Sequence, residues 1–125
     1  MATGNVKATY INNNKRIEIT LTVYSWEENG ILYMYSPALD LTGYGTSKKE
    51  ADQSFKITLG EFIKYTHNKK TIFEELERLG WTVNRKKKRV NAPTKEELLQ
   101  DNEVFRKLSN KKNIKHYNQP IAIPV

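Results

Sequence analysis

The sequence predicts an α+β protein. We expect a three- to four-stranded, mainly antiparallel sheet with one main helix packed on one face, followed by a C-terminal helical and extended tail. Residues 17–23 alternate apolar and polar side chains, as a strand with one buried face does. Asn29-Gly30 follows as a strong hairpin signal. Ser47 then opens an amphipathic run to about His67, which predicts a helix with one apolar face.

Further strands are expected around this centre. Residues 6–11 can form a first strand, and residues 31–35 are apolar or aromatic and suit a pleated surface. Gly43 and Gly45 bracket a short extended piece, where the backbone needs angles or close approaches that a side chain would forbid. Residues 81–83 are expected to form a closing strand.

The main helix is expected to cover the aliphatic face of the sheet. That face would carry Ile17, Ile19, Leu21 and Val23, and the helix would present a stripe of Ala51, Phe55, Leu59 and Phe62, with Ile63 at its edge. Three pairs have the spacing of a helix capping box: Ser47 with Glu50, Thr71 with Glu74, and Thr94 with Glu97.

An aromatic patch is expected on the opposite face. If Asn29 and Gly30 are the turn centre, Trp26 lies opposite Tyr33 and Tyr24 lies opposite Tyr35. An odd-length loop would change this register. An aromatic patch of this size is typical of a surface that binds a protein partner or a second copy of the chain. In the alternative, the C-terminal segment folds back and covers the patch. The four candidate binding residues are Tyr24, Trp26, Tyr33 and Tyr35.

The charge distribution suggests two parts. Residues 1–84 contain ten Lys/Arg and ten Asp/Glu, whereas residues 85–125 contain eleven Lys/Arg and four Asp/Glu. The whole net charge of +7 therefore lies in the last third of the chain. We expect a neutral folded domain over residues 1–84 and a basic C-terminal arm over residues 85–125, with one or two short helices and then an extended tail.

The arm begins with a run of basic residues that can contact a phosphate backbone or an acidic partner. The run is Arg85, Lys86, Lys87, Lys88 and Arg89. The alternative is a solvated linker that stays extended by self-repulsion. At the far end, Ile121, Ile123 and Val125 alternate with other residues, and two prolines interrupt them. This pattern fits a short terminal strand and a docking peptide equally well.

Catalytic chemistry is not expected. The chain has no cysteine and therefore no thiolate metal site. A metal-dependent nuclease would need clustered carboxylates, for which the strand candidates are Glu18 and Asp40. Glu27 and Glu28 flank the hairpin turn, and His67 and His116 stand in polar stretches, so solvated positions explain them better. We therefore expect a non-enzymatic protein without cofactor or metal.

Residues 16–83 resemble the HicB-like antitoxin domain. The resemblance rests on Tyr33-Met34-Tyr35-Ser36-Pro37, an aromatic strand that ends in proline, and on Gly45-Thr46-Ser47-Lys48-Lys49-Glu50-Ala51, a glycine followed by a capped helix opening. It implies a truncated ribonuclease H-like fold. It also implies a protein that binds and blocks a small RNA-cleaving toxin.

Two other functions compete with this hypothesis. One is a nucleic-acid-binding regulator that uses the basic arm, and the other is a metal-dependent nuclease.

The N-terminal residues lack an apolar run, and no stretch approaches the length of about 18 apolar residues that a membrane span needs. A cytoplasmic protein without membrane contact is expected, acting on a small basic toxin.

Overall fold

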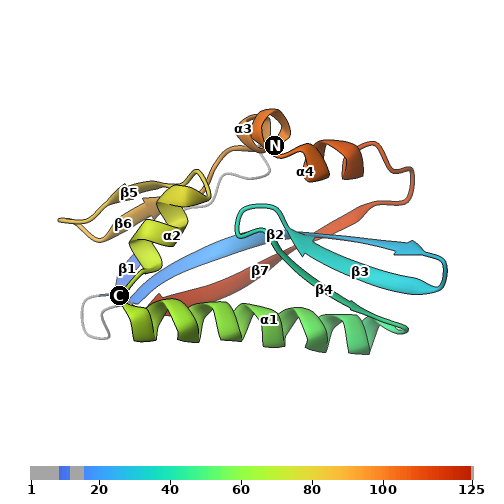
Figure 1. The fold of residues 1–125 in the computed structure, drawn as a ribbon, viewed down its shortest axis with the longest axis horizontal. Coiled ribbons are helices and arrows are strands. Elements are labelled where there is room, and N and C mark those ends of the chain that lie inside the picture. The colour runs from blue at the N-terminus through green and yellow to red at the C-terminus, as the bar shows by residue number, and fades with distance from the viewer. Residues whose placement is uncertain (1–8, 12–15, 125) are drawn as a thin grey trace.

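The computed structural model describes residues 9–11 and 16–124 and arranges them in three layers (Figure 1). An antiparallel sheet is the middle layer, and helix α1 (Lys48–Lys69) covers one face of it. Helices α3 (Lys95–Asp101) and α4 (Glu103–Leu108) lie over the other face. The predicted α+β class, with one main helix packed on the sheet, is confirmed.

The main sheet is built around one long central strand, β2. Its strands are β1 (Thr9–Ile11), β2 (Arg16–Glu28), β3 (Ile31–Ser36), β4 (Leu41–Gly45) and β7 (Lys115–Pro124). Strand β7 pairs with β2 along one edge, and β3 followed by β4 lies on the other. Strand β1 pairs with the beginning of β2, and every pairing is antiparallel. The first strand expected from the sequence is described from Thr9 onward, and residues 6–8 lie outside the described residues.

The turn between β2 and β3 has the predicted centre. Asn29 and Gly30 have φ angles of 54° and 81°, as a two-residue hairpin turn with both central residues in the left-handed region requires. Trp26 is therefore the Cα partner of Tyr33, and Tyr24 that of Tyr35. The predicted register of this hairpin is confirmed.

The core between α1 and the sheet is the one that the periodicity predicts. Ile17, Ile19, Leu21 and Val23 are buried on the sheet side, and Ala51, Phe55 and Leu59 are buried on the helix side. Phe62 and Ile63 pack against this cluster while partly exposed. The apolar face of β2, with its period of two residues, thus packs against the apolar stripe of α1, and this burial stabilises both the strand and the helix.

Glycines in β4 allow α1 to approach the sheet closely. A Cβ atom on Gly43 would overlap the backbone nitrogen of Phe55 and lie 2.5 Å from its Cα. A Cβ atom on Gly45 would lie 2.5 Å from the Cβ of Glu50. The predicted close approach at both glycines is confirmed, and the neighbour is the first half of α1.

We expect Gly43→Ala to lower the free energy of unfolding by about 1–3 kcal/mol, because α1 must move away from β4. Gly60→Ala is the matched control. Gly60 lies within α1, and a Cβ atom there would have no neighbour within 4 Å. The control should stabilise the protein by about 0.5–1 kcal/mol, since alanine is the better helix former. Urea denaturation measures both, and equal effects of the two changes would contradict the role of Gly43.

The boundary expected after residue 84 falls inside a hairpin. Strands β5 (Thr82–Asn84) and β6 (Arg89–Asn91) pair with each other in a separate two-stranded sheet. The expected closing strand around Trp81 thus pairs outside the main sheet. Trp81 itself is buried, and its Nε1 donates to the carbonyl of Ala38 at 2.7 Å, which ties α2 (Ile72–Arg78) and the hairpin to the β3–β4 connection.

Residues 85–125 contribute to both faces of the folded body. The expected order of two short helices and an extended segment is present, but the extended segment is β7, whose ten residues all pair with β2. Ile123 is buried in the main core. Of the two alternatives for the C-terminal alternation, a strand is what the structure contains, and Val125 lies outside the described residues.

Prolines fit in β7 because it is an edge strand. Among the described strands, β7 pairs with β2 alone. Pro120 is the Cα partner of Thr20 and Pro124 that of Arg16, so both prolines have the same parity along the ladder. A proline has no N–H to donate, and because the two positions have equal parity, one alternation of the ladder lets both face away from β2. The outer edge of β7 thereby loses donors that another strand would need.

Only one of the three predicted capping boxes is complete. Thr94 and Glu97 bond to each other's backbone N–H at the start of α3. Ser47 accepts from the backbone of Glu50, but the carboxylate of Glu50 bonds to the residue before the cap instead. Thr71 is the N-cap residue of α2 but makes no side-chain cap bond, so the predicted capping box of Thr71 and Glu74 is wrong.

Candidate binding surface

Two of the four predicted binding residues are buried within the chain. Tyr24 is 8% exposed and Tyr35 is 3% exposed. Both lie in a second core with residues of α3 and α4, and the rings of Tyr24 and Phe105 are 4.9 Å apart. At these two positions the C-terminal segment folds back over the aromatic face, which is the alternative that the sequence left open.

A hydrogen-bond network fixes Tyr35 under the helices. Its hydroxyl donates to Oδ1 of Asp40 and accepts from Nδ2 of Asn102, both at 2.8 Å. Asn102 also caps α4, since its Oδ1 accepts from the backbone N–H of Phe105 at 3.0 Å. Burial raises the pKa of Tyr35 above its ordinary value, and the neighbouring Asp40 carboxylate raises it further. Asp40, a candidate nuclease residue, is engaged in this network.

The other two predicted residues belong to an aromatic row that crosses three strands. Trp26 on β2, Tyr33 on β3 and Tyr44 on β4 are successive Cα partners, and we call these three residues the aromatic row. The rings of Trp26 and Tyr33 are stacked, with centroids 5.4 Å apart and 16° between their planes. Tyr33 and Tyr44 lie 6.3 Å apart and are tilted. Tyr44 is 62% exposed, and Trp26 and Tyr33 are partly exposed.

The aromatic row lies at the end of the sheet where the β2–β3 hairpin extends past α4 (Figure 1). The helices cover Tyr24 and Tyr35 but leave Tyr44 exposed. An ion pair of 3.3 Å between Lys111 and Glu28 holds the α4–β7 connection to the hairpin. The row is therefore presented on a paired, braced part of the sheet.

The backbone at this edge is less available than the side chains. Strand β4 pairs with β3 alone among the described strands, but its Tyr44 N–H donates to Oγ of Ser54 on α1 at 3.1 Å. A satisfied donor cannot recruit an added strand at that position. A partner at this site would meet the aromatic side chains of the face rather than the strand edge.

Tyr44 is the residue that the sequence reading missed. Its signal is the alternation Gly43-Tyr44-Gly45, in which the glycines face α1 and the tyrosine must face the other side. The Asn29-Gly30 turn gave the β2–β3 register, but no comparable turn signal fixes the β3–β4 register. Without the β3–β4 register, the sequence does not show that Tyr44 lies beside Tyr33 in the aromatic row.

The basic run lies at the other end of the molecule. Residues 85–88 connect β5 to β6, and Arg89 is the first residue of β6. This hairpin lies at the left of Figure 1, and the β2–β3 hairpin lies at the right. Arg85 forms ion pairs with Glu74 at 3.2 Å and with Glu77 at 2.6 Å. Lys86, Lys87 and Arg89 are exposed. The structure does not bring the aromatic row and the basic run together.

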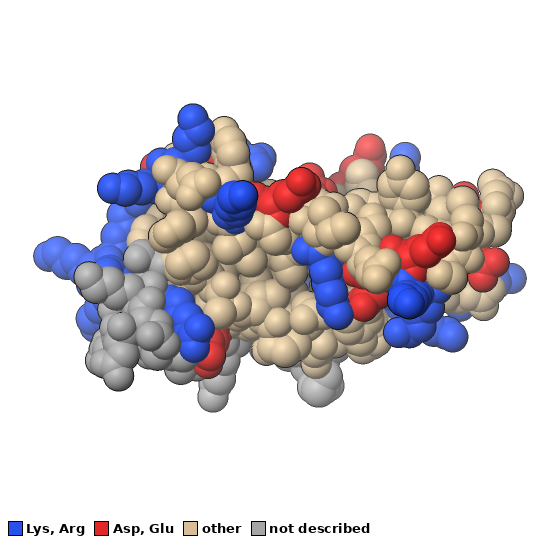
Figure 2. Space-filling view, turned by 90° about the horizontal axis from the view of Figure 1, so that it is seen from below, with Lys and Arg blue, Asp and Glu red and all other residues tan. Residues whose placement is uncertain are grey.

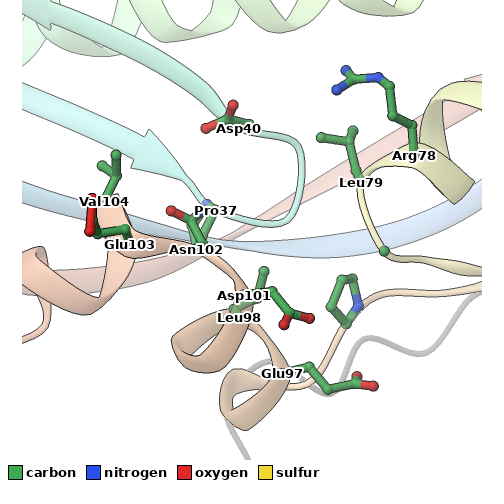
Figure 3. A pocket seen from close by; sticks show the side chains of 12 residues that line it. Pro37, Asp40, Arg78, Leu79, Glu97, Leu98, Asp101, Asn102, Glu103 and Val104 are labelled. Atoms are coloured by element: carbon green, nitrogen blue, oxygen red, sulfur yellow. The ribbon is translucent and has the colours of Figure 1, made fainter.

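A cleft of about 440 Å³ lies between the α3–α4 segment, the end of α2 and the β3–β4 connection (Figure 3). Four carboxylates line it, while Arg78 is the one Lys or Arg among the lining residues. Arg78 is itself paired with Glu75 at 2.8 Å. The carboxylates are Asp40, Glu97, Asp101 and Glu103.

The remaining titratable candidates are dispersed. Glu18, Glu27 and Glu28 are exposed on β2, as are His67 and His116 on α1 and β7. Over residues 9–11 and 16–124, no three His, Cys, Asp or Glu side chains are grouped so that they could hold a metal ion. None of the helices in the described part of the chain combines the length and the apolar character that crossing a membrane requires.

Comparison with known proteins gives no relative. No family model matches the chain, and no curated protein and no solved structure matches it at a significant level. Functional inference therefore rests on the residues and their geometry.

Proposed function

We propose that this chain is a non-catalytic protein-binding domain that uses the aromatic row to anchor a protein partner. The observation that carries the proposal is the row of Trp26, Tyr33 and Tyr44, which is wholly or partly exposed on a sheet face where the helices cover Tyr24 and Tyr35. Aromatic side chains are enriched among the residues that dominate binding energy. A rigid sheet presents them with little loss of conformational entropy on binding.

The resemblance to HicB-like antitoxins suggests the class of partner. It supports a small basic toxin that cleaves RNA, which the bound domain would block sterically. The acidic lining of the cleft beside α3 and α4 supports the same class, because a basic partner complements it in charge. Such an antitoxin acts in the cytoplasm, where the toxin and its RNA target meet. No metal or cofactor takes part in this mechanism.

Tyr44→Ala is expected to weaken binding of the partner at least about tenfold, because it removes an exposed aromatic anchor. Tyr65→Ala is the matched control, since Tyr65 is also 62% exposed but lies on α1 at the opposite face. The antitoxin class predicts that a small basic protein is encoded beside this chain. Calorimetry with that protein measures the effect of both variants on binding, and an RNA-cleavage assay measures inhibition.

The outcomes separate the two parts of the proposal. A neighbouring protein that neither binds nor is inhibited would overturn the antitoxin class. Binding that Tyr44→Ala and Tyr65→Ala weaken equally would overturn the aromatic row as the anchor. A second copy of the chain is the other occupant to consider, and sedimentation of the two variants without partner detects it as a dimer that only Tyr44→Ala dissociates.

A further inference from the structure

The longest uninterrupted run of basic residues in the sequence lies on the β5–β6 hairpin. The five basic residues 85–89 occupy the connection and the first position of β6. Figure 2 shows Lys and Arg side chains gathered at this end of the molecule. The exposed Lys69 and Lys70, at the C-terminal end of α1, lie at the same end. Local charge of one sign attracts a polyanion over a distance of about a Debye length.

The base of this hairpin is anchored to the folded body. Val90 is 1% exposed and belongs to the main core, and it pairs with Val83 across the ribbon. The two ion pairs of Arg85 with Glu74 and Glu77 attach the same point to α2, and the Arg85 guanidinium lies 5.6 Å from the ring of Phe73. Arg85 therefore holds the hairpin in place, whereas the residues after it are available for binding.

Local hydrogen bonds shape the turn without using the charged groups. The Asn84 side chain accepts from the backbone N–H of Lys87 at 3.1 Å, and Lys88 N–H donates to the carbonyl of Arg85 at 3.4 Å. Lys88 has a φ angle of 50°, a left-handed conformation that glycine or asparagine would adopt at lower cost. Within the described part of the chain, Arg85 is the one residue of the run in an ion pair. The turn thus presents the exposed Lys86, Lys87 and Arg89 and the partly exposed Lys88, and none of these four forms an ion pair with another described residue.

The dimensions of the hairpin suit the major groove of B-form DNA. That groove is about 12 Å wide and about 8.5 Å deep, and it admits a two-stranded ribbon. Paired strands lie about 4.8 Å apart, and three residues extend about 10 Å, so a ribbon of this size can enter with its turn first. The major groove of A-form RNA is deep and narrow, so a two-stranded ribbon cannot enter it in the same way. Duplex DNA is therefore the nucleic acid that the geometry favours.

We propose that the β5–β6 hairpin binds duplex DNA, with Lys86, Lys87, Lys88 and Arg89 contacting phosphates on both sides of the major groove. This surface is separate from the aromatic row and does not depend on a protein partner. Four phosphate contacts predict that the logarithm of the binding constant falls with the logarithm of salt concentration with a slope of about −3.6. Raising salt from about 50 to about 200 mM should then weaken binding about a hundredfold.

The test is fluorescence anisotropy of the full chain with a short labelled DNA duplex at several salt concentrations. Replacing Lys86 and Lys87 by Gln should reduce the magnitude of the slope by about 1.8. The matched control replaces Lys48 and Lys49, two neighbouring exposed lysines at the start of α1, and should leave the slope unchanged. Lys88→Gly preserves the positive φ and should reduce the slope by about 0.9 without loss of stability.

Each outcome decides the proposal. Equal binding by the Lys86/Lys87 variant and the wild type would overturn it, as would equal losses from this variant and its control. The same chain is also titrated with double-stranded RNA, single-stranded RNA and polyglutamate, and binding of any of these as tightly as duplex DNA would overturn the choice of ligand. Tyr44→Ala should leave DNA binding unchanged. A failure of the aromatic row to anchor a protein partner can therefore be distinguished from a failure of the hairpin to bind DNA.

Discussion

Removal of residues 115–125 is expected to abolish cooperative folding of the whole domain. The deletion takes away β7, the partner of β2 from Arg16 to Ser25. It leaves the backbone groups of that edge unpaired and exposes the core that Ile123 helps to close. An unpaired edge and an opened core together exceed the few kcal/mol that hold a small domain folded. Circular dichroism during urea titration should show loss of the sigmoidal transition.

Two point variants keep this prediction testable if the truncated chain cannot be produced. Ile123→Ala should lower the free energy of unfolding by about 2–4 kcal/mol, because it creates a cavity in the core. Ala122→Ser, at the exposed neighbouring position of β7, should change it by less than about 0.5 kcal/mol. A truncated chain that unfolds as the full chain does would mean that these residues form a detachable arm instead.

Phe105→Ala is expected to lower the free energy of unfolding by about 3–5 kcal/mol, because it leaves a cavity in the second core. Phe105 is fully buried and fixes α4 on Tyr24. Its loss should expose Tyr24 and Tyr35, so hydrogen exchange should accelerate in α3 and α4 while α1 stays protected. Val104→Ala changes the neighbouring residue of the same helix, which is 57% exposed, and should have almost no effect. Equal effects of the two changes would contradict the packing of α4 on the aromatic face.

Local patterns predicted the centre of the fold correctly. The alternation of Ile17 to Val23 and the stripe from Ala51 to Phe62 each place apolar residues at the period of their element. Asn29 and Gly30 specify a turn through their own backbone preferences. Such features depend on a few consecutive residues, and one sequence is enough to read them.

The C-terminal third could not be predicted in the same way. Its charge excess suggested an arm, but net charge describes solubility and association rather than backbone pairing. Pro120 and Pro124 interrupt the terminal alternation, so that a strand and a docking peptide fit it equally well, yet an edge strand tolerates both prolines on its outward side. The charged run from Arg85 suggests either a contact surface or an extended linker, and only the pairing of the flanking Val83 and Val90 makes it the connection of a hairpin.

The candidate site, too, was predictable where it depends on neighbouring residues and not where it depends on distant segments. The sequence placed Tyr24, Trp26, Tyr33 and Tyr35 on one face in the correct register. It could not show which of them stay exposed, because α3 and α4 reach that face from about seventy residues further along the chain, as the bond of Asn102 to Tyr35 illustrates.

By itself, the sequence determined the strands and helix of the central unit, the turn between β2 and β3, and the two faces of the sheet. Only the tertiary structure decided that β7 completes the sheet and that Tyr24 and Tyr35 are covered. It also decided that Tyr44 joins Trp26 and Tyr33 in the exposed row. The physical reason is that periodicity and turn preference belong to neighbouring residues. Strand pairing and burial depend instead on which distant surfaces compete for the same edge or face.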